Sequence, residues 1–315
     1  MDLRPGTHKG RHSLPQTHQP NLPLTHHEAA KRMLRIRRML RTDIPFAIQL
    51  TDQENWSIPK QDFERILRLN PRGSFIATEG MRRVGIATTA SYGRKIAWIG
   101  NVVVREQYRG KHIGQALVTH AINYLHKTHV KHVALYCFDE NVEFYRKLGF
   151  IEGSRFTRLR REAKRASKKP ERNDSFNRLT VPAILSLDRK AFGADRSSVI
   201  LDLLNSRSAS VFSVVHGQGR SYLLAKNYAD MCELGPWVSF ELSDAILDAV
   251  LGESLLQASG MPVEIARLLD HAQTAAMFRR HSFRVIKTGC SMHLHAIPRI
   301  GSPAGILALG FLDKG

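Results

Sequence analysis

The sequence predicts a mixed α/β fold of the α+β class, with two similar domains that each contain a twisted, mostly antiparallel mixed sheet flanked by helices. Three observations support this prediction. Short β-branched runs alternate with stretches of helical periodicity along the chain. A chain of 315 residues is long enough for about two domains. Residues 271–283 also align with residues 138–150, so the second half repeats the first in degraded form.

The N-terminal segment, residues 1–33, is rich in Pro, His, Thr and Gln and shows no hydrophobic periodicity, so we predict that it is disordered. Its five histidines have no spacing that fixes a metal geometry, and we predict no metal site. Met33 directly precedes the first periodic segment, which makes it an alternative start of translation.

The rest of the composition indicates a cytoplasmic protein. Hydrophobic residues make up 43% of the chain, and no apolar run approaches the ~18 residues of a membrane span. The first 30 residues lack the apolar core of a secretory signal. Cys137, Cys232 and Cys290 are odd in number and widely spaced, which is typical of buried thiols in a reducing compartment and not of a disulfide framework.

The first periodic elements follow the tail. Residues 34–39 alternate like a strand. Asp43 and Pro45 are typical of an N-cap and a first helical turn, which predicts a helix through Leu50. A second helix has apolar residues between positions 63 and 69 and ends at residues 70–73. Residues 74–78 and 84–88 then predict a hairpin of two strands.

A strand through Val104, a loop and a helix to about Leu125 follow, and then a strand with alternating apolar residues at 133–137. Residues 139–141 cap a short helix through Leu148. Gly149 ends this helix in the left-handed conformation, and Phe150 begins the last strand of the first half.

Residues 98–115 are the most informative stretch, because a β-branched run leads through a short loop into a helix. The free backbone N–H groups of such a loop, together with the helix macrodipole, form an anion site. Gly110 and Gly114 allow the backbone to approach a phosphate closely, while Arg109 and Lys111 add positive charge. The alternative interpretation is a glycine loop that only turns the chain.

The spacing excludes two nucleotide motifs. No Lys-Ser/Thr pair follows Gly110 as in a P-loop, and residues 110–114 do not fit the Gly-x-Gly-x-x-Gly of dinucleotide sites. Residues 109–114 instead resemble the pyrophosphate loop, Arg/Gln-x-x-Gly-x-Gly/Ala, of the GCN5-related N-acetyltransferase (GNAT) superfamily. His112 departs from the pattern, because the family usually has a glycine there. We expect His112 to keep helical backbone angles and to weaken or reshape cofactor binding.

The resemblance covers residues 34–157 and includes a second signature at residues 139–150. In the family, an Asn at the position of Asn141 binds the pantetheine arm, and a Tyr at the position of Tyr145 donates a proton to the departing thiolate. Their separation of four places both on one helix face. For Tyr145, the alternative is a core aromatic residue.

The implied reaction is the direct transfer of an acetyl group from acetyl-CoA to a primary amine, with Tyr145 as catalytic acid. The resemblance also implies a splayed fourth strand at residues 102–104, where backbone N–H groups hold the thioester and the pantetheine amide. The residues expected to bind acetyl-CoA are Val102, Val103, Val104, Arg109, Gly110, Lys111, His112, Ile113, Gly114, Gln115 and Asn141.

No general base is evident, because residues 96–104 contain no carboxylate. Asp52 and Glu54 lie beside Trp56 in the loop expected to line the acceptor site, and the alternative is that both are solvent-exposed acids. His120, His126, His129 and His132 follow no metal-ligand spacing and are interpreted as surface residues.

The second half lacks these features. Phe278 aligns with Tyr145 and cannot donate a proton, and Thr274 aligns with Asn141. The strand that contains residues 234–238 leads to a helix at 244–256 without an Arg-Gly-rich loop, and Pro236 predicts a bend or a sheet edge. With its Ala-Phe-Gly-Ala-Asp-Arg segment at 191–196, this half resembles the second half of tandem acetyltransferases. We expect it to be non-catalytic and to cover the acceptor side or shape specificity, with a closing strand at 305–310.

We therefore predict a tail over residues 1–33, a catalytic domain over 34–157, a basic linker over 158–175 and a degenerate GNAT-like domain over 176–315. Residues 1–172 contain 33 Lys or Arg against 15 Asp or Glu, whereas residues 173–315 are nearly neutral. This charge fits either an acidic partner, such as RNA or the ribosome, or a solvated basic linker. A non-enzymatic acetyl-CoA sensor is a further alternative to the enzyme.

Overall fold

The computed structural model describes residues 33–164, 177–240, 243–269, 272–310 and 312–315. We call residues 33–164 the first half and the described residues from 177 onward the second half. Nearly all of the predicted N-terminal tail, and the predicted linker from residue 165, lie outside the described residues. No helix among the described residues has the length and apolar character needed to cross a membrane.

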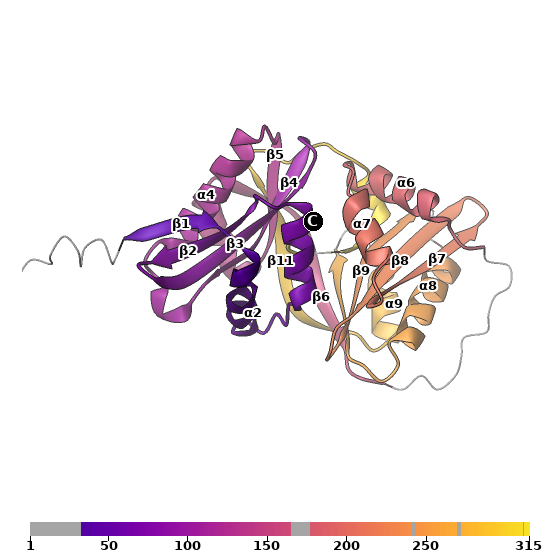
Figure 1. Ribbon diagram of the computed structural model, residues 1–315. Helices are drawn as coiled ribbons and strands as arrows, with labels where there is room; N and C mark the ends of the chain where they lie inside the picture. Colours follow the sequence, from indigo (N-terminus) through magenta and orange to yellow (C-terminus); the bar gives the residue numbers. More distant parts are fainter. Residues whose placement is uncertain (1–32, 165–176, 241–242, 270–271, 311) are drawn as a thin grey trace, which may run out of the picture.

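The strands of the described chain are β1 (Leu34–Arg38), β2 (Ser74–Glu79), β3 (Arg82–Tyr92), β4 (Ile96–Val104), β5 (His132–Phe138), β6 (Phe150–Arg161), β7 (Ala209–His216), β8 (Gly219–Asn227), β9 (Cys232–Phe240), β10 (Val263–Leu268), β11 (Arg284–Leu294) and β12 (Ile306–Leu309). They form one continuous sheet in the order β1-β2-β3-β4-β5-β11-β6-β10-β12-β9-β8-β7 (Figure 1). Only β4 with β5 and β9 with β10 pair in parallel, which confirms the predicted mixed, mostly antiparallel sheet.

The α-helices are α2 (Ile44–Asp52), α3 (Lys60–Leu69), α4 (Ile113–Lys127), α5 (Val142–Arg146), α6 (Val181–Phe192), α7 (Ser197–Leu204), α8 (Asp244–Gln257) and α9 (Ala272–Arg280). They cover both faces of the sheet because alternate strand residues point to opposite sides. In β2, Phe75 and Ala77 pack with α4, whereas Ile76 packs with α2 and α3. In β8, Leu223 packs with α8, whereas Leu224 packs with α6 and α7.

The elements predicted for the first half are present, with boundaries that differ by a few residues. Gly149 has the expected left-handed backbone, with φ 88°. Asp43 precedes α2 as predicted, but its carboxylate makes no capping bond to this helix. It instead binds Arg37 and Arg83 and accepts a hydrogen bond from the Leu40 N–H, because it is buried among these groups. β6 continues to Arg161, past the predicted boundary at residue 157.

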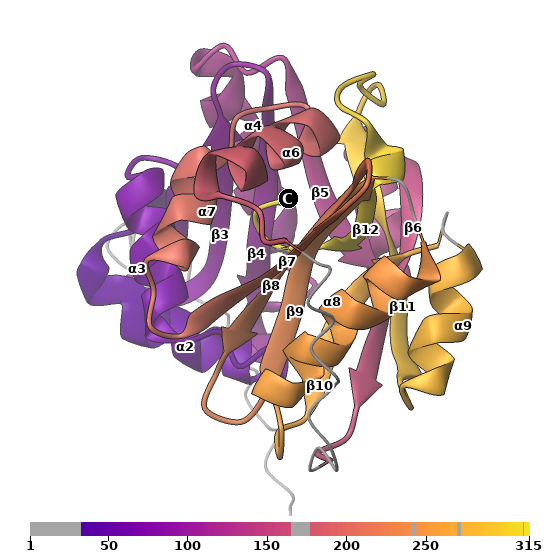
Figure 2. The ribbon, with the colours of Figure 1, turned by 90° about the vertical axis from the view of Figure 1, so that its right-hand side faces the viewer.

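The two halves share strands. β11, from the second half, pairs with β5 and β6 and so lies inside the sheet of the first half. β6, from the first half, pairs in turn with β10 of the second half. The helices α6 and α7 also join the halves, because they pack against Tyr92 and Trp98 as well as against their own sheet. Figure 2 shows these helices over the strands of both halves.

In the second half, one predicted strand is present and one predicted sheet edge is absent from the described structure. The closing strand predicted at 305–310 is β12, although it lies between β9 and β10 and not at an edge. Pro236 lies in β9, an interior strand, so the predicted sheet edge is wrong. The register of β9 is irregular toward both β8 and β12 around this residue, which agrees with the predicted bend and accommodates its missing N–H.

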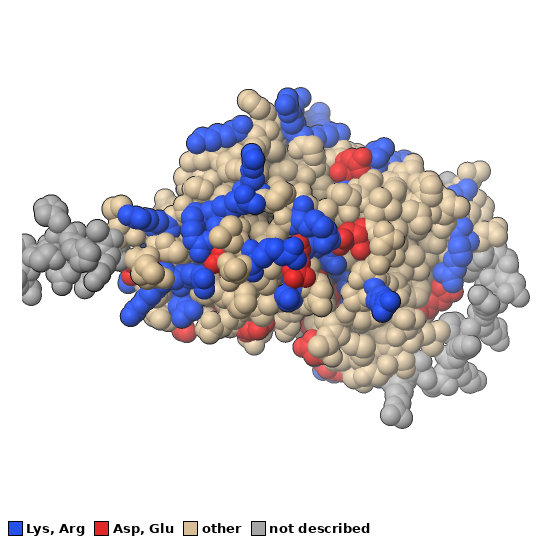
Figure 3. Space-filling view, in the orientation of Figure 1, with Lys and Arg blue, Asp and Glu red and all other residues tan. Residues whose placement is uncertain are grey.

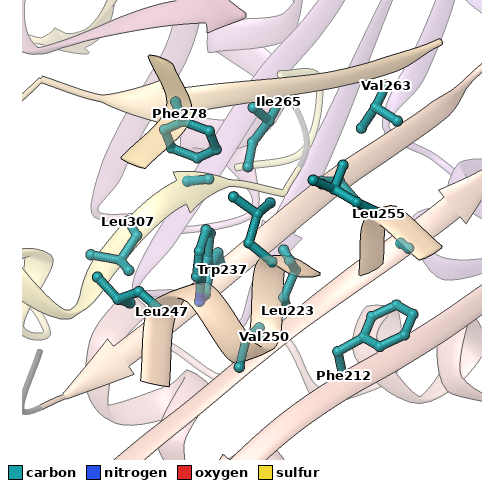
Figure 4. Close-up of a cluster of buried hydrophobic side chains, with 14 of the residues drawn as sticks. Phe212, Leu223, Trp237, Leu247, Val250, Leu255, Val263, Ile265, Phe278 and Leu307 are labelled. Atoms are coloured by element: carbon teal, nitrogen blue, oxygen red, sulfur yellow. The ribbon is translucent and has the colours of Figure 1, made fainter. Parts of the chain in front are cut away.

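A large apolar core lies under α8 and α9 (Figure 4). Trp237 of β9 is fully buried at its centre, and the Phe278 ring lies 6.1 Å from it in an edge-to-face arrangement. Leu307 of β12 joins the same cluster, so the closing strand seals this core. The residue that aligns with Tyr145 is thus part of the hydrophobic core of the second half.

One buried histidine predicts how stability responds to pH. His293 on β11 is 9% exposed, and its Nδ1 has no hydrogen-bond partner among the described residues. Burial, with a smaller contribution from His132, lowers the pKa of His293 to about 4. The unfolded chain takes up this proton near pH 6.5, so stability is complete above that pH and is lost as the pH falls toward 4.

We therefore expect His293→Leu to remove about 2–3 kcal/mol of the stability that the wild type loses between pH 7 and pH 4.5. Urea unfolding at both pH values measures this difference. His126→Leu is the control, because His126 is an exposed histidine on α4. Equal losses of stability in the wild type and in His293→Leu would contradict the prediction.

Candidate functional site

The strands β4 and β5 separate halfway along their length. They pair only from Ile96 to Ile99, opposite residues 132–135. Asn101 has a left-handed backbone, with φ 49°, and forms a bulge against β3, which turns the rest of β4 away from β5. Asparagine tolerates this conformation better than most residues. On the side of β5, no strand of the described chain therefore lies beside β4 from Gly100 to Val104.

The loop that follows β4 exposes main-chain donors. Gly110 has φ 76°, which only glycine adopts without strain. No acceptor in the described chain binds the N–H groups of Gly110, Lys111 or His112. The first turn of α4 adds further free N–H groups and the positive end of the helix dipole. Loop and helix together present the free main-chain donors that the predicted anion site requires.

His112 corrects the prediction made for it. Its backbone is left-handed, with φ 57° and ψ 13°, and not helical. It is the N-cap residue of α4, and its Nδ1 lies 3.3 Å from the Gln115 side-chain oxygen. The chain reverses at this position before it enters the helix, which explains why a glycine suits the position. A histidine here keeps the loop geometry at a cost in backbone strain.

The charged side chains of the loop have partners in the first half. Arg109 donates to the Val104 carbonyl oxygen over 3.1 Å and forms an ion pair with Glu54. The Lys111 ammonium lies 5.0 Å from the centre of the Tyr108 ring. Glu54 is thus bound to the loop, and Asp52 is exposed at the end of α2. Neither acid is placed as a free base.

Asn141 is the N-cap residue of α5, the helix that follows β5, and Tyr145 lies near the other end of this short helix; both line the cavity described below. The Tyr145 ring packs in the core beside Phe150, but its hydroxyl has no hydrogen-bond partner among the described residues. Burial raises the pKa of the Tyr145 phenol, and the nearby Cys137 adds to this shift. The phenol is therefore protonated at neutral pH and able to donate.

A single cavity of about 690 Å³ connects these features, a size typical of ligand sites. Every residue predicted for the site lines it except Lys111. The described residues of this cavity also include Trp56, as the sequence suggested for the acceptor side.

The far end of the cavity is built by residues that sequence reasoning missed. They come from α3, β6, β8, β9, the connection between β8 and β9 and the segment after β12, and are Asp62, Arg158, Lys226, Tyr228, Met231, Glu233, Leu312 and Asp313. No local motif marks them, because they are brought together only by the packing of the two halves.

This far end is strongly polar. The Tyr228 hydroxyl lies 3.2 Å from an Asp62 oxygen and 3.1 Å from a Glu233 oxygen. The Lys226 ammonium lies 2.8 Å from Glu233. Burial alone would raise the pKa of Asp62, but the charges of Lys314, Arg65 and Lys226 lower it below its usual range. Asp62 is therefore a paired anion.

Of the three cysteines, Cys137 lines the cavity, and of the histidines interpreted as surface residues, none does. The His120 ring packs against Phe75. Cys137 and Cys290 face each other across β5 and β11, and all three cysteines are free and buried. No cluster of metal-binding side chains occurs among the described residues.

Basic residues gather on the first half. Figure 3 shows many Lys and Arg side chains over this half and fewer over the second half. Exposed arginines lie on β1 and at the start of β3, at positions 35, 37, 38, 82 and 83. Residues 158–161 of the predicted basic linker are the end of β6, where Arg158 and Arg160 pair with Glu264. These four residues are therefore part of a paired strand.

Residues 35–150 match the model of the Acetyltransferase (GNAT) family. No curated protein matches the chain in sequence. A candidate acetyltransferase from Pyrococcus horikoshii has a similar structure, with a TM-score of 0.72 and 18% identity over 96% of this chain and 100% of that chain.

Two further structures resemble the chain over most of its length. A GCN5-related N-acetyltransferase from Sphaerobacter thermophilus has a TM-score of 0.64 and 14% identity over 85% of this chain and 97% of that one. A tandem GNAT protein from the clavulanic acid biosynthesis pathway has a TM-score of 0.63 and 14% identity over 84% and 99%. At these identities the likeness shows the fold. The chain therefore has the fold of tandem GNAT proteins, and its residues 35–150 match the model of the GNAT acetyltransferase family.

Proposed function

We propose that the protein transfers an acetyl group from acetyl-CoA to a primary amine, with one active site in the first half. The observation that carries this proposal is the continuous cavity. It joins the free N–H groups of the 110–112 loop, the unpaired edge of β4 and the Tyr145 hydroxyl to a polar end enclosed by the second half.

The residues present fit acetyl-CoA. The loop and the N-terminus of α4 offer main-chain donors and positive charge to the diphosphate. The open edge of β4 offers main-chain groups to the amides of the pantetheine arm, and Asn141 lies across the cavity from it. When bound, acetyl-CoA supplies a thioester whose carbonyl carbon accepts the amine. Tyr145 holds the proton that the departing sulfur requires.

The second half contributes a wall and no second site to this proposal. β9 and β10 separate after three paired residues, much as β4 and β5 separate after four, but β12 fills the gap and pairs with both strands. The Phe278 side chain has no proton to give. The opening that would admit a cofactor is therefore occupied by the chain itself.

Two other functions stay as predictions that experiments separate from this one. A sensor would bind acetyl-CoA without amine-dependent release of coenzyme A. An RNA or other acidic partner of the basic first half would bind with an affinity that falls steeply with salt concentration.

If the 110–112 loop binds the diphosphate, a change in its backbone should weaken the binding of acetyl-CoA. In Gly110→Ala the side chain disfavours φ 76°, so the free loop relaxes and binding must restore it. We expect the Kd for acetyl-CoA to rise about 5–10-fold, measured by isothermal titration calorimetry. Gly252→Ala is the matched control, because a methyl group at this helical position meets open space. An unchanged Kd in Gly110→Ala would contradict the anion site.

If Tyr145 is the proton donor, its replacement should slow turnover. Tyr145→Phe removes the proton donor while leaving the ring in the core, so we expect kcat to fall about 100-fold with acetyl-CoA affinity unchanged. Release of coenzyme A measures turnover on a panel of amines. Tyr124→Phe, on the outer part of α4, is the matched control. Full activity of Tyr145→Phe would remove this tyrosine from the mechanism.

The filled gap between β9 and β10 predicts the stoichiometry. Calorimetric titration of the full chain is expected to give one acetyl-CoA per chain. A value of two would show that the second half also binds the cofactor.

A further inference from the structure

The strand that holds the thioester in the proposed function brings no base of its own. From Ile96 to Val104 it contains no carboxylate, yet an ammonium group must lose a proton before its nitrogen can attack. The cavity beside β4 therefore has to draw a proton acceptor from another element.

The structure places such a group, the carboxylate of Asp313, beside β4. Asp313 follows β12 and closely approaches Gly100 of β4, directly after the residues over which this strand pairs with β5. A side chain at position 100 would overlap the main chain of Asp313, so Gly100 is what permits this approach. The Asn101 amide donates to Asp313 Oδ2 over 3.0 Å.

Several anchors hold this segment in place. The Tyr92 hydroxyl donates to the Lys314 carbonyl oxygen over 2.6 Å. Arg196 donates to the Gly315 main-chain oxygen over 2.7 Å and is itself fixed by the buried carboxylate of Asp188. Asp313 is thus held by both halves at once. The segment at 191–196, which the sequence singled out, acts here through Arg196.

Only one oxygen of the Asp313 carboxylate is hydrogen-bonded among the described residues. Its Oδ2 accepts from Asn101 and from the Lys314 ammonium, which lies 2.6 Å away. Its Oδ1 has no hydrogen-bond partner among the described residues, and the side chain is 17% exposed and lines the cavity. One oxygen is therefore left to accept a proton.

The other carboxylates that line the cavity are less suited. Glu54 is bound to Arg109 at the diphosphate end. Asp62 is buried and paired with Arg65, and Glu233 is bound by Lys226. Asp313, by contrast, closely approaches Gly100 at the start of the open edge of β4.

We propose that Asp313 is the catalytic base that takes the first proton from the acceptor ammonium; this inference rests on the proposed function. Oδ1 accepts one proton and later releases it to solvent. The freed nitrogen forms a bond to the acetyl carbon as the carbon–sulfur bond breaks. Tyr145 gives its proton to the leaving sulfur, and the nitrogen loses a second proton, which restores the tyrosine. The products are an amide, coenzyme A and one proton.

Asp313→Asn tests this role sharply, because the amide oxygen can still accept from Asn101 and Lys314 but cannot take up a proton. The assay follows release of coenzyme A by the full chain with acetyl-CoA and spermidine, L-lysine, glucosamine or a peptide with a free N-terminus. We expect kcat/KM to fall about 100-fold or more with the best of these amines. The Kd for acetyl-CoA is expected to stay within about twofold, and the melting temperature to stay close to that of the wild type.

Three comparisons complete the experiment. Asp248→Asn, an exposed acid on α8, should keep wild-type turnover. Asp313→Ala should regain part of its activity in sodium formate but not in sodium chloride of the same ionic strength, because formate supplies the missing carboxylate. Asp313→Asn with turnover within tenfold of the wild type would overturn the role of Asp313 and leave the proposed function standing. A wild type that binds acetyl-CoA but releases no coenzyme A with any of the amines would overturn both.

Discussion

The separation of β4 from β5 is the constraint on which the rest of the site depends. Two parallel strands that stayed paired to their ends would satisfy each other's main-chain groups and leave nothing for a ligand. The bulge at Asn101 breaks this pairing, and its side chain ties the bulge to Thr88 on one side and to Asp313 on the other. The same residue thus opens the sheet and positions the group we propose as the base.

The two halves solve the same geometric problem in opposite ways. In each, two parallel strands diverge and expose unpaired main-chain groups, which must find partners. In the second half, β12 provides those partners and its apolar side chains complete the core around Trp237. In the first half no described strand fills the gap along Gly100–Val104, and the segment after β12 touches its start. β12 and the segment that follows it therefore fill the gap between β9 and β10 and place Asp313 at the gap between β4 and β5.

Holding that segment requires buried charge. Asp188, Arg196 and Tyr222 form a network inside the second half, and the Arg196 guanidinium also lies over the Phe192 ring, 4.3 Å from its centre. A buried ion pair adds little net stability, because desolvation offsets the attraction between the charges. The Asp188–Arg196 pair matters here for geometry, because Arg196 holds the Gly315 main-chain oxygen at the interface between the halves. The ion pair therefore positions this segment.

The sequence by itself determined the elements of the first half, the glycine loop at 109–115 with its free main-chain donors, and the presence of Asn141 and Tyr145 in one cavity. These depend on periodicity and on spacings of a few residues, which local sequence records. The tertiary structure decided the left-handed backbone of His112, the insertion of β11 between β5 and β6, and the approach of Asp313 to Gly100. Such contacts join residues up to about two hundred positions apart, and strand periodicity does not specify which strands become neighbours. They depend on how two similar halves pack into one sheet.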